Sequence, residues 1–543
     1  MRPVQPAYQD AVPLPRRCRG SFGEVLEAAV PFIIAAGANA IKLSCDRVML
    51  AWHSDIAMCA ALAAGATAFM AASLFIGISG YAAVFVSQYY GAREHEKIGS
   101  VVWQSIFLSL IFGALVAVLG QAGASVFSLA GHQEELALME AEYFRLLMGG
   151  AVFSLVSTSL MCFWIGRKKT WAVVAVNLAC IGLNILLNYL LIFGWPQAGT
   201  GQAAGGSVPV PFLLPALGVK GAALATILSD AFKMAILFCL FLTPANREFY
   251  RTLPRRLYNS AIARKLLYVG AGNGVQFLLS VGSIALFHLL IGRYASGADG
   301  VSVAVASGIA FSLNAAAFIP MIGLGSASAM LVAHGVGAGN EEYVRRVVAN
   351  ACLLAMLYMA TVVILFVLFP QNAIAVFSRE GGLSPHTAEL ATLFLYFSVV
   401  VFIADSCAIL YGSAIRGAGD AHYAAKVSAV LGGLLAPVCL VAVWLGAGAD
   451  VLWAIVTLYA VSKAAAYYCR YRQGLWKRMS LVGPRALPLE PAGQGLCPWG
   501  PLAKALPLEP AGQGLCPWNP LGEMISPRPP QRGMGNCKRS HFA

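Results

Sequence analysis

Twelve long apolar stretches recur along the chain, and each, at about 20 residues, is long enough to cross a hydrocarbon core about 30 Å thick. We place them near residues 24–46, 55–85, 99–121, 142–165, 171–194, 217–242, 264–291, 301–334, 347–369, 387–413, 423–446 and 450–470. Because 59% of the residues are hydrophobic and only 11% are charged, the stretches predict an all-α integral membrane protein with twelve transmembrane helices. The second and eighth are longer than one span requires, so we expect those helices to be tilted or bent.

The positions of Lys and Arg predict which helix ends face the cytoplasm. If the N-terminus is cytoplasmic, the inner side receives Arg16, Arg17, Arg19, Arg93, Lys97, Arg167, Lys168, Lys169, Arg247, Arg251, Arg255, Arg256, Arg264, Lys265, Arg345, Arg346, Arg416 and Lys426. The opposite loops hold little beyond Arg47, Lys220, Arg293 and Arg379. This asymmetry predicts a multi-pass protein of the plasma (inner) membrane with both termini in the cytoplasm. It also accounts for the net charge of +13, so we expect contact with membrane lipid and none with nucleic acid.

Two similar segments predict an internal repeat. "VSQYYGAREHEKIGSVV", beginning at Val86, and "VAHGVGAGNEEYVRRVV", beginning at Val332, share Val, Gly-Ala, Glu and Val-Val in register, 246 residues apart. Each follows the second long helix of a six-helix half, so we expect two six-helix lobes related by duplication, as in many transporters. The alternative is a coincidence of small residues in short turns. The predicted divisions are a cytoplasmic N-terminal segment (1–22), an N-lobe (23–242), a basic cytoplasmic linker (243–263) and a C-lobe (264–472).

We expect no functional site in the segments outside the helices. The tail, 473–543, contains "ALPLEPAGQGLCPW" at 486 and again at 505, and this Pro- and Gly-rich composition predicts disorder. The Gly- and Pro-rich loop 194–218 is uncharged and is interpreted as a flexible cover. The thirteen cysteines form no CxxC pair, so we expect neither a metal site nor a disulfide framework, and no cofactor.

Polar residues inside the apolar stretches are candidates for function. Asn184 and Asn188 lie one turn apart and therefore on one helix face, where they form either a cation- or proton-linked patch or ordinary hydrogen bonds between helices. Thr226 and Asp230 are also one turn apart, and the alternative to a functional Asp230 is a pair with nearby Lys233.

Two further acids stand out. Asp405 has no basic residue within a turn and is interpreted as an unpaired intramembrane acid, the alternative being a hydrogen bond to a hydroxyl group of a neighbouring helix. In "NAIKLSCDRVML", residues 39 to 50, Lys42 lies one turn before Asp46 on the same face. The pair is either an interfacial one that ends the helix or part of a coupling site.

These segments resemble the MATE family, multidrug and toxic compound extrusion, within the multidrug, oligosaccharidyl-lipid and polysaccharide exporters. The resemblance covers residues 22 to 472 and rests on "CDRVMLAW", the two repeated segments, "NILLNYLLIFG" followed by "GVKGAALATILS", and "ADSCAILYGSAIRGAGD". It implies two lobes around a central cavity and export of cationic or amphipathic compounds in exchange for protons or sodium.

The resemblance also assigns residues to roles. The first-helix coupling acid falls on Asp46, and the polar positions of the N-lobe cation site fall on Asn184, Asn188 and Thr226. The tenth-helix acid of the C-lobe falls on Asp405. In the seventh helix, Ser280 stands where sodium-coupled bacterial members tend to carry Glu, and Gln276 is its polar neighbour one turn before. This departure favours proton coupling through the N-lobe.

Lys42 is a second departure from the family pattern, and it would modulate Asp46 by favouring the charged carboxylate. The sequence therefore predicts a secondary active antiporter whose ligands are a small cationic or amphipathic molecule and a coupling H⁺ or Na⁺. A flippase for a lipid-linked saccharide is the alternative within the same fold, but few Lys or Arg lie within the apolar stretches to hold a pyrophosphate. A membrane-embedded enzyme or a channel is less favoured, since no HExxH or GxSxG motif occurs.

Overall fold

The computed structural model describes residues 20–123, 125–129, 132–194, 215–254, 257–293, 300–377 and 384–482, in which every regular element is a helix. The helices are α1 (Phe22–His53), α2 (Asp55–Gly80), α3 (Ala82–Gly91), η1 (His95–Lys97), α4 (Ile98–Gly123), α5 (Val126–Leu129), α6 (Glu134–Ile165), α7 (Thr170–Phe193), α8 (Val219–Phe241), α9 (Pro244–Tyr250), α10 (Ser260–Arg293), α11 (Gly300–Gly337), α12 (Glu341–Leu368), α13 (Pro370–Ala375), α14 (Pro385–Ala418), α15 (Ala421–Trp444), α16 (Ala449–Arg472) and η2 (Leu475–Arg478). Within these residues, 12 candidate spans are long and apolar enough to cross a membrane, which confirms the predicted number.

The predicted spans agree with the observed helices except at their ends. The second stretch is divided at Tyr81 between α2 and α3. The eighth, α11, is one continuous helix that contains Pro320. Helix α1 continues to His53, two turns beyond Asp46, so the alternative in which Lys42 and Asp46 end the first helix is wrong.

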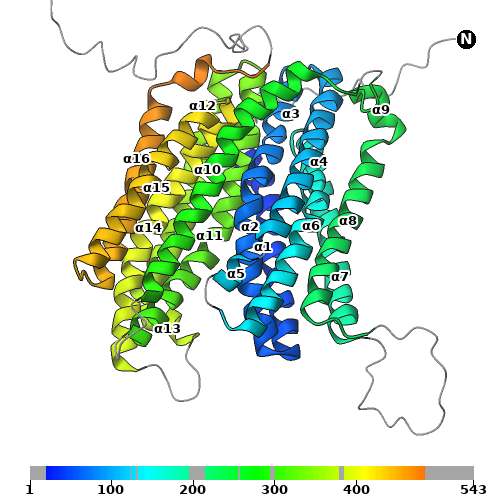
Figure 1. Ribbon diagram of the computed structural model, residues 1–543. Helices are drawn as coiled ribbons and strands as arrows, with labels where there is room; N and C mark the ends of the chain where they lie inside the picture. Colours follow the sequence, from blue (N-terminus) through cyan, green and yellow to red (C-terminus); the bar gives the residue numbers. More distant parts are fainter. Residues whose placement is uncertain are drawn as a thin grey trace, which may run out of the picture. The chain divides into compact units, whose positions relative to one another are not determined.

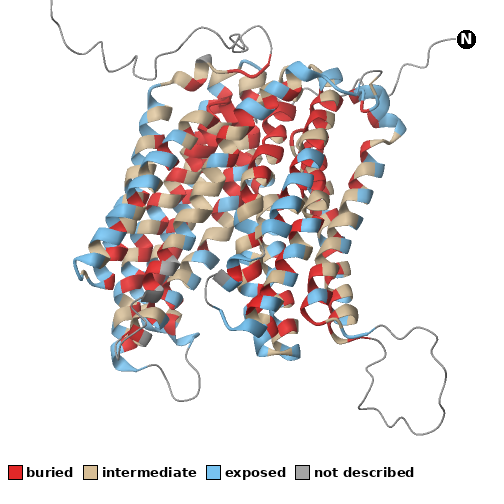
Figure 2. Ribbon diagram, viewed as in Figure 1, coloured by how far each residue is buried: buried red, intermediate tan, exposed pale blue. Residues whose placement is uncertain are grey.

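The helices form two bundles (Figure 1). We call the bundle of α1 to α8 the N-lobe and the bundle of α10 to α16 the C-lobe; in Figure 1 the C-lobe lies on the left. Figure 2 shows buried residues gathered inside the bundles, while exposed positions follow the outward surfaces of the helices. Many of those exposed side chains are large and apolar, for example Ile111, Val118 and Leu458, as expected for helices that face lipid.

The two lobes meet chiefly through α1 with α11, α2 with α10, and α3 with α11. We call the end of the bundles at which α1 begins and α6 ends the N-terminal face, and the other end the opposite face. The repeated segments contact each other at the N-terminal face. A methyl group added to Gly91 would lie 2.2 Å from the carbonyl oxygen of His334, and one added to Gly337 would lie 2.0 Å from that of Gln88.

These glycine contacts are reciprocal. Gly91 and Gly337 are 246 residues apart, and so are Gln88 and His334, so each copy of the repeat places its glycine against the same backbone position of the other copy. Such an exchange is the geometry of a local two-fold axis between the copies. Only glycine allows the backbones to approach this closely, because any Cβ atom would overlap the opposite carbonyl group.

Several predictions fall on residues outside those described. They concern most of the N-terminal segment, the loop between α7 and α8, and nearly all of the duplicated tail. Every described helix lies within one unit, Met1–Pro488. The predicted linker 243–263 contains α9, and its Thr252 carbonyl accepts a hydrogen bond from Trp103 Nε1 over 2.7 Å.

Candidate functional site

A polar cluster in the N-lobe contains the first-helix acid. Asp46 of α1 is buried, with 9% of its surface exposed, and Asn184 and Asn188 of α7 are fully buried. Asn188 Nδ2 donates a hydrogen bond to Asp46 Oδ1. The same amide nitrogen lies 3.4 Å from Asn184 Oδ1, and Asn184 Nδ2 lies 3.4 Å from Ser229 Oγ of α8. One chain of hydrogen bonds therefore links α1, α7 and α8.

The predicted helix face of Asn184 and Asn188 is observed, since both amides point into this chain. Thr226 takes part through its backbone: its carbonyl oxygen accepts from Ser229 Oγ over 2.9 Å. Ser229 was not among the predicted residues, although it lies three residues after Thr226 on α8 and a serine at that spacing is a signal for the same face.

One atom in the cluster lacks a partner. Asn188 Oδ1 is buried and accepts no hydrogen bond from any of the described residues. A buried acceptor without a donor is unfavourable, and such atoms often mark a place for a water, an ion or a changing protonation state. The unpartnered oxygen belongs to the amide that contacts Asp46, so it adds an acceptor next to the carboxylate.

Charged residues surround the cluster without joining it. No ion pair connects Lys42 to Asp46 in the described part of the chain, but the charge of Lys42 acts electrostatically on both Asp46 and Asp230. Asp230 Oδ1 lies 2.8 Å from Lys233 Nζ. Asp230 therefore makes the pair that the sequence left as the alternative, whereas the partner of Asp46 is a neutral amide.

The C-lobe acid is paired, contrary to the prediction. Asp405 Oδ1 of α14 lies 2.9 Å from Lys463 Nζ of α16, and the two side chains are 24% and 16% exposed. The interpretation of Asp405 as an unpaired acid is wrong, because it considered only basic residues within a turn of the same helix. Lys463 reaches Asp405 from a neighbouring helix.

Gln276 also lies in the C-lobe, away from Asp46. Its side-chain oxygen accepts a hydrogen bond from Arg416 Nη1 of α14 over 3.0 Å, and its backbone oxygen accepts from Ser280 Oγ over 2.9 Å. Of the predicted site residues, the structure thus groups Asp46, Asn184, Asn188 and Thr226, places the Asp230 pair beside them, and leaves Gln276 and Asp405 in the other lobe.

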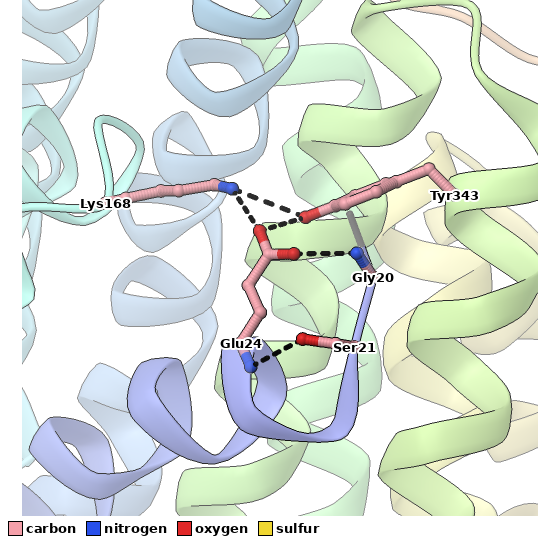
Figure 3. A network of polar contacts seen from close by, with 5 residues as sticks. All are labelled: Gly20, Ser21, Glu24, Lys168 and Tyr343. Carbon is pink, nitrogen blue, oxygen red and sulfur yellow. Dashed lines mark hydrogen bonds and ion pairs between the residues drawn. The ribbon is translucent and has the colours of Figure 1, made fainter. Parts of the chain in front are cut away.

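A second polar network joins the lobes at the N-terminal face (Figure 3). Glu24 Oε1 of α1 accepts from Lys168 Nζ and from the Tyr343 hydroxyl of α12, both over 2.8 Å. Its other oxygen accepts from the Gly20 amide over 2.7 Å, and the Ser21 hydroxyl caps α1 by accepting from the Glu24 amide over 3.3 Å. The side chain of Glu24 therefore binds residues of both lobes at once.

Comparison with known proteins adds relatives of this architecture. The MatE family profile matches residues 38–190 and 274–465, one stretch in each lobe. A probable multidrug resistance protein NorM of Thermotoga maritima is 25% identical over 407 residues, 73% of this chain and 80% of that protein. The multidrug resistance protein MdtK of Pectobacterium atrosepticum is 24% identical over 396 residues, 72% of this chain and 81% of that protein.

Solved structures share the fold. A transporter of the MOP superfamily from Pyrococcus furiosus superposes with a TM-score of 0.71 at 18% identity, covering 84% of this chain and 97% of that one. A eukaryotic MATE transporter, AtDTX14, has a TM-score of 0.71 at 17% identity, covering 84% and 96%. The predicted fold of twelve helices in two lobes is thereby confirmed.

Proposed function

Because the chain belongs to the MATE family, multidrug and toxic compound extrusion, we propose that it is a secondary active antiporter that exports cationic or amphipathic compounds in exchange for H⁺ or Na⁺. The names of its relatives, multidrug resistance proteins, support this substrate class. Membership in a transporter family excludes the alternative of a membrane-embedded enzyme.

The observation that carries the proposal is the hydrogen bond between Asp46 and the neutral amide of Asn188. A charged Asp46 only accepts, so the amide presents its N–H group. A protonated Asp46 has an O–H group to donate, and Asn188 Oδ1, which is otherwise unpartnered, accepts it once the amide rotates. Asp46 can therefore change its charge while keeping the same partner, as a coupling acid requires.

The same oxygen atoms also suit a sodium ion, which prefers oxygen ligands, so both coupling ions belong to the proposal. In either case, binding of the coupling ion neutralises the carboxylate that attracts a cationic substrate. Exchange of one coupling ion for one monovalent substrate cation moves no net charge, so the concentration gradient of the ion drives transport. Each tenfold ion gradient provides about 1.4 kcal/mol, which sustains a tenfold substrate gradient.

Contacts between the lobes support an assignment of the conformation. The Glu24 network and the reciprocal glycine contacts both lie at the N-terminal face. We take this face as the cytoplasmic one, with both termini inside the plasma (inner) membrane, because the basic loops gather there. The described state is then closed toward the cytoplasm, and Asp46, nearer the end of α1, belongs to the half that faces outward.

The flippase alternative is less well supported by the charges. A site for a lipid pyrophosphate needs free cationic side chains. Three basic residues in the described helices instead pair with carboxylates: Lys233 with Asp230, Lys463 with Asp405, and Arg470 with Asp420.

Transport into or out of proteoliposomes tests the proposal. The purified full-length protein is reconstituted, a proton or sodium gradient is imposed, and uptake of a fluorescent organic cation is followed. We expect wild type to respond to one of the two gradients and Asp46→Asn to lose the response, because an amide cannot gain and lose charge. Asp55→Asn, the same substitution at an exposed acid that begins α2, is the matched control and should transport normally. A gradient response in Asp46→Asn equal to wild type contradicts the coupling role.

A further inference from the structure

We propose that Lys463 is an internal counter-ion that occupies Asp405 in place of a coupling cation, so that ion exchange and cation recognition are confined to the N-lobe. The inference rests on the proposed antiport and specifies which acid performs it. It concerns Lys463 of α16, which lies outside the N-lobe cluster around Asp46.

The first support is geometry. Lys463 Nζ lies 2.9 Å from Asp405 Oδ1, and both side chains are largely buried. The ammonium group also lies 5.2 Å from the ring centre of Tyr459, one helical turn before Lys463, in a cation–π contact. The titratable groups near the ammonium are Asp405, Tyr459 and Tyr467. Of these, only the carboxylate is an anion at neutral pH, so Asp405 and Lys463 compensate each other's charge.

The second support is the cost of separating them. Breaking a buried ion pair leaves an uncompensated charge, which is strongly unfavourable in an apolar environment. A proton or Na⁺ that binds Asp405 must first displace a tethered ammonium group whose effective concentration is high. At Asp46, by contrast, an incoming cation meets a carboxylate held by a neutral amide and needs to displace no side-chain cation.

The third support is the state of two further polar residues of the C-lobe, Gln276 and Ser280. A sodium site needs several oxygen atoms around the ion. The side-chain oxygen of Gln276 already accepts from Arg416 Nη1 over 3.0 Å, and the Ser280 hydroxyl donates to the backbone of its own helix. Side-chain cations thus occupy both the carboxylate of Asp405 and the amide oxygen of Gln276. In the C-lobe the cations bind these acceptors directly, whereas Lys42 and Arg47 act on Asp46 electrostatically and make no ion pair with it among the described residues.

Infrared difference spectroscopy of the purified full-length protein in lipid bilayers tests this inference. Changing pH or sodium concentration reveals the C=O stretch of a carboxyl group that gains a proton, or a shifted carboxylate band when Na⁺ binds. We expect the wild-type difference spectrum to persist in Asp405→Asn and to lose a band in Asp46→Asn. Lys463→Met should gain a new band, and the double variant Lys463→Met/Asp405→Asn should lose that band again.

The result that overturns the inference is a wild-type band that disappears in Asp405→Asn, because Asp405 then exchanges its proton or cation despite Lys463. A Lys463→Met protein that folds and gains no band also contradicts it. If Lys463→Met does not fold, the charge-neutral double variant replaces it, and its spectrum should equal that of wild type. Proteoliposome transport reports on the antiport proposal separately, since a failure of gradient-driven export leaves the spectral comparison unaffected.

Discussion

Replacing Tyr343 with Phe removes one hydroxyl group from the contact between the lobes, and we expect the N-terminal face to open more often. The hydroxyl donates to Glu24 Oε1 over 2.8 Å and accepts from Lys168 Nζ over 3.3 Å (Figure 3). Tyr343 belongs to the C-lobe, whereas Glu24 and Lys168 belong to the N-lobe. Both hydrogen bonds therefore exist only while the lobes are together, and the phenyl ring that remains keeps its packing.

The expected size of the effect follows from the partners that Glu24 retains. A hydrogen bond to a charged group contributes about 1.5–3 kcal/mol net. Glu24 keeps its bonds from Lys168 Nζ and the Gly20 amide after the substitution, so we take the lower value, about 1.5 kcal/mol. Because about 1.4 kcal/mol corresponds to a factor of ten, the population open at this face should rise about tenfold.

Hydrogen–deuterium exchange of the protein in lipid nanodiscs measures that population. Gly20 lies against α12 of the C-lobe: its carbonyl oxygen accepts from Asn350 Nδ2 over 2.6 Å, and a Cβ atom added at this glycine would lie 3.0 Å from Arg346 Cβ. The segment that begins α1 therefore loses these partners and becomes accessible to exchange when the lobes separate. Peptides that contain the start of α1 should therefore exchange about tenfold faster in Tyr343→Phe, where exchange follows the open population. Tyr358→Phe is the matched control on the same helix, because the Tyr358 hydroxyl donates to Ala317 within the C-lobe over 2.8 Å.

The control should lose thermal stability but leave exchange at the start of α1 unchanged. The reasoning fails if Tyr343→Phe exchanges at this position at the wild-type rate. It also fails if Tyr358→Phe accelerates exchange there to the same extent, since the effect would then reflect general destabilisation.

Three further predictions use other parts of the chain. Gly337→Ala should abolish transport by preventing the lobes from closing at the N-terminal face, since its methyl group would lie 2.0 Å from the carbonyl oxygen of Gln88. Gly308→Ala should transport normally, because its methyl group would meet no neighbouring atom within 4 Å. Lys463→Met should destabilise the protein by about 3–5 kcal/mol, and adding Asp405→Asn should restore most of the loss, as thermal unfolding of the single and double variants will show. Deleting residues 484–543, which follow the last helix, should leave proteoliposome transport intact, and a correctly inserted but inactive truncation contradicts this.

The fold was predictable because a bilayer imposes helix length and composition. Each apolar stretch has to satisfy its own backbone hydrogen bonds, so length and hydropathy alone identified every span. Helix ends were less predictable, and α1 continues to His53 rather than ending near residue 46. Its last turns carry Arg47 and His53. A span predicted from hydropathy ends before such polar residues, although they are tolerated in a helix end near the membrane interface.

The N-lobe cluster was partly predictable, because helical periodicity places residues four apart on one face. Asn184 and Asn188 obey this rule, and their shared face meets Asp46. The contribution of α8 was only half anticipated: the Thr226 side chain was expected, but Ser229 supplies the hydroxyl. Helical periodicity predicts which face of α8 points to the cluster, with an error of about one residue. Packing against α7 then decides which side chain on that face makes the contact.

Proximity along the sequence was a poor guide to charge pairing, in both directions. Lys42 precedes Asp46 by one turn, yet Asp46 binds the neutral amide of Asn188 on another helix. Asp405 has no basic residue within a turn, yet Lys463 of α16 binds it. A spacing of four residues permits an ion pair without requiring one, because an amide that donates to the carboxylate competes with the ammonium group.

The difference between these two acids then decides what each can do. Asp405 is compensated by Lys463 of the same polypeptide, so in our proposal it exchanges no cation during the transport cycle. Asp46 accepts a hydrogen bond from a neutral amide, which stabilises its charged form without neutralising it. An acid of the second kind can exchange a proton or a cation during each cycle. In our proposal, the identity of the partner, rather than the depth of the acid in the membrane, therefore distinguishes the exchangeable carboxylate, Asp46, from the structural one, Asp405.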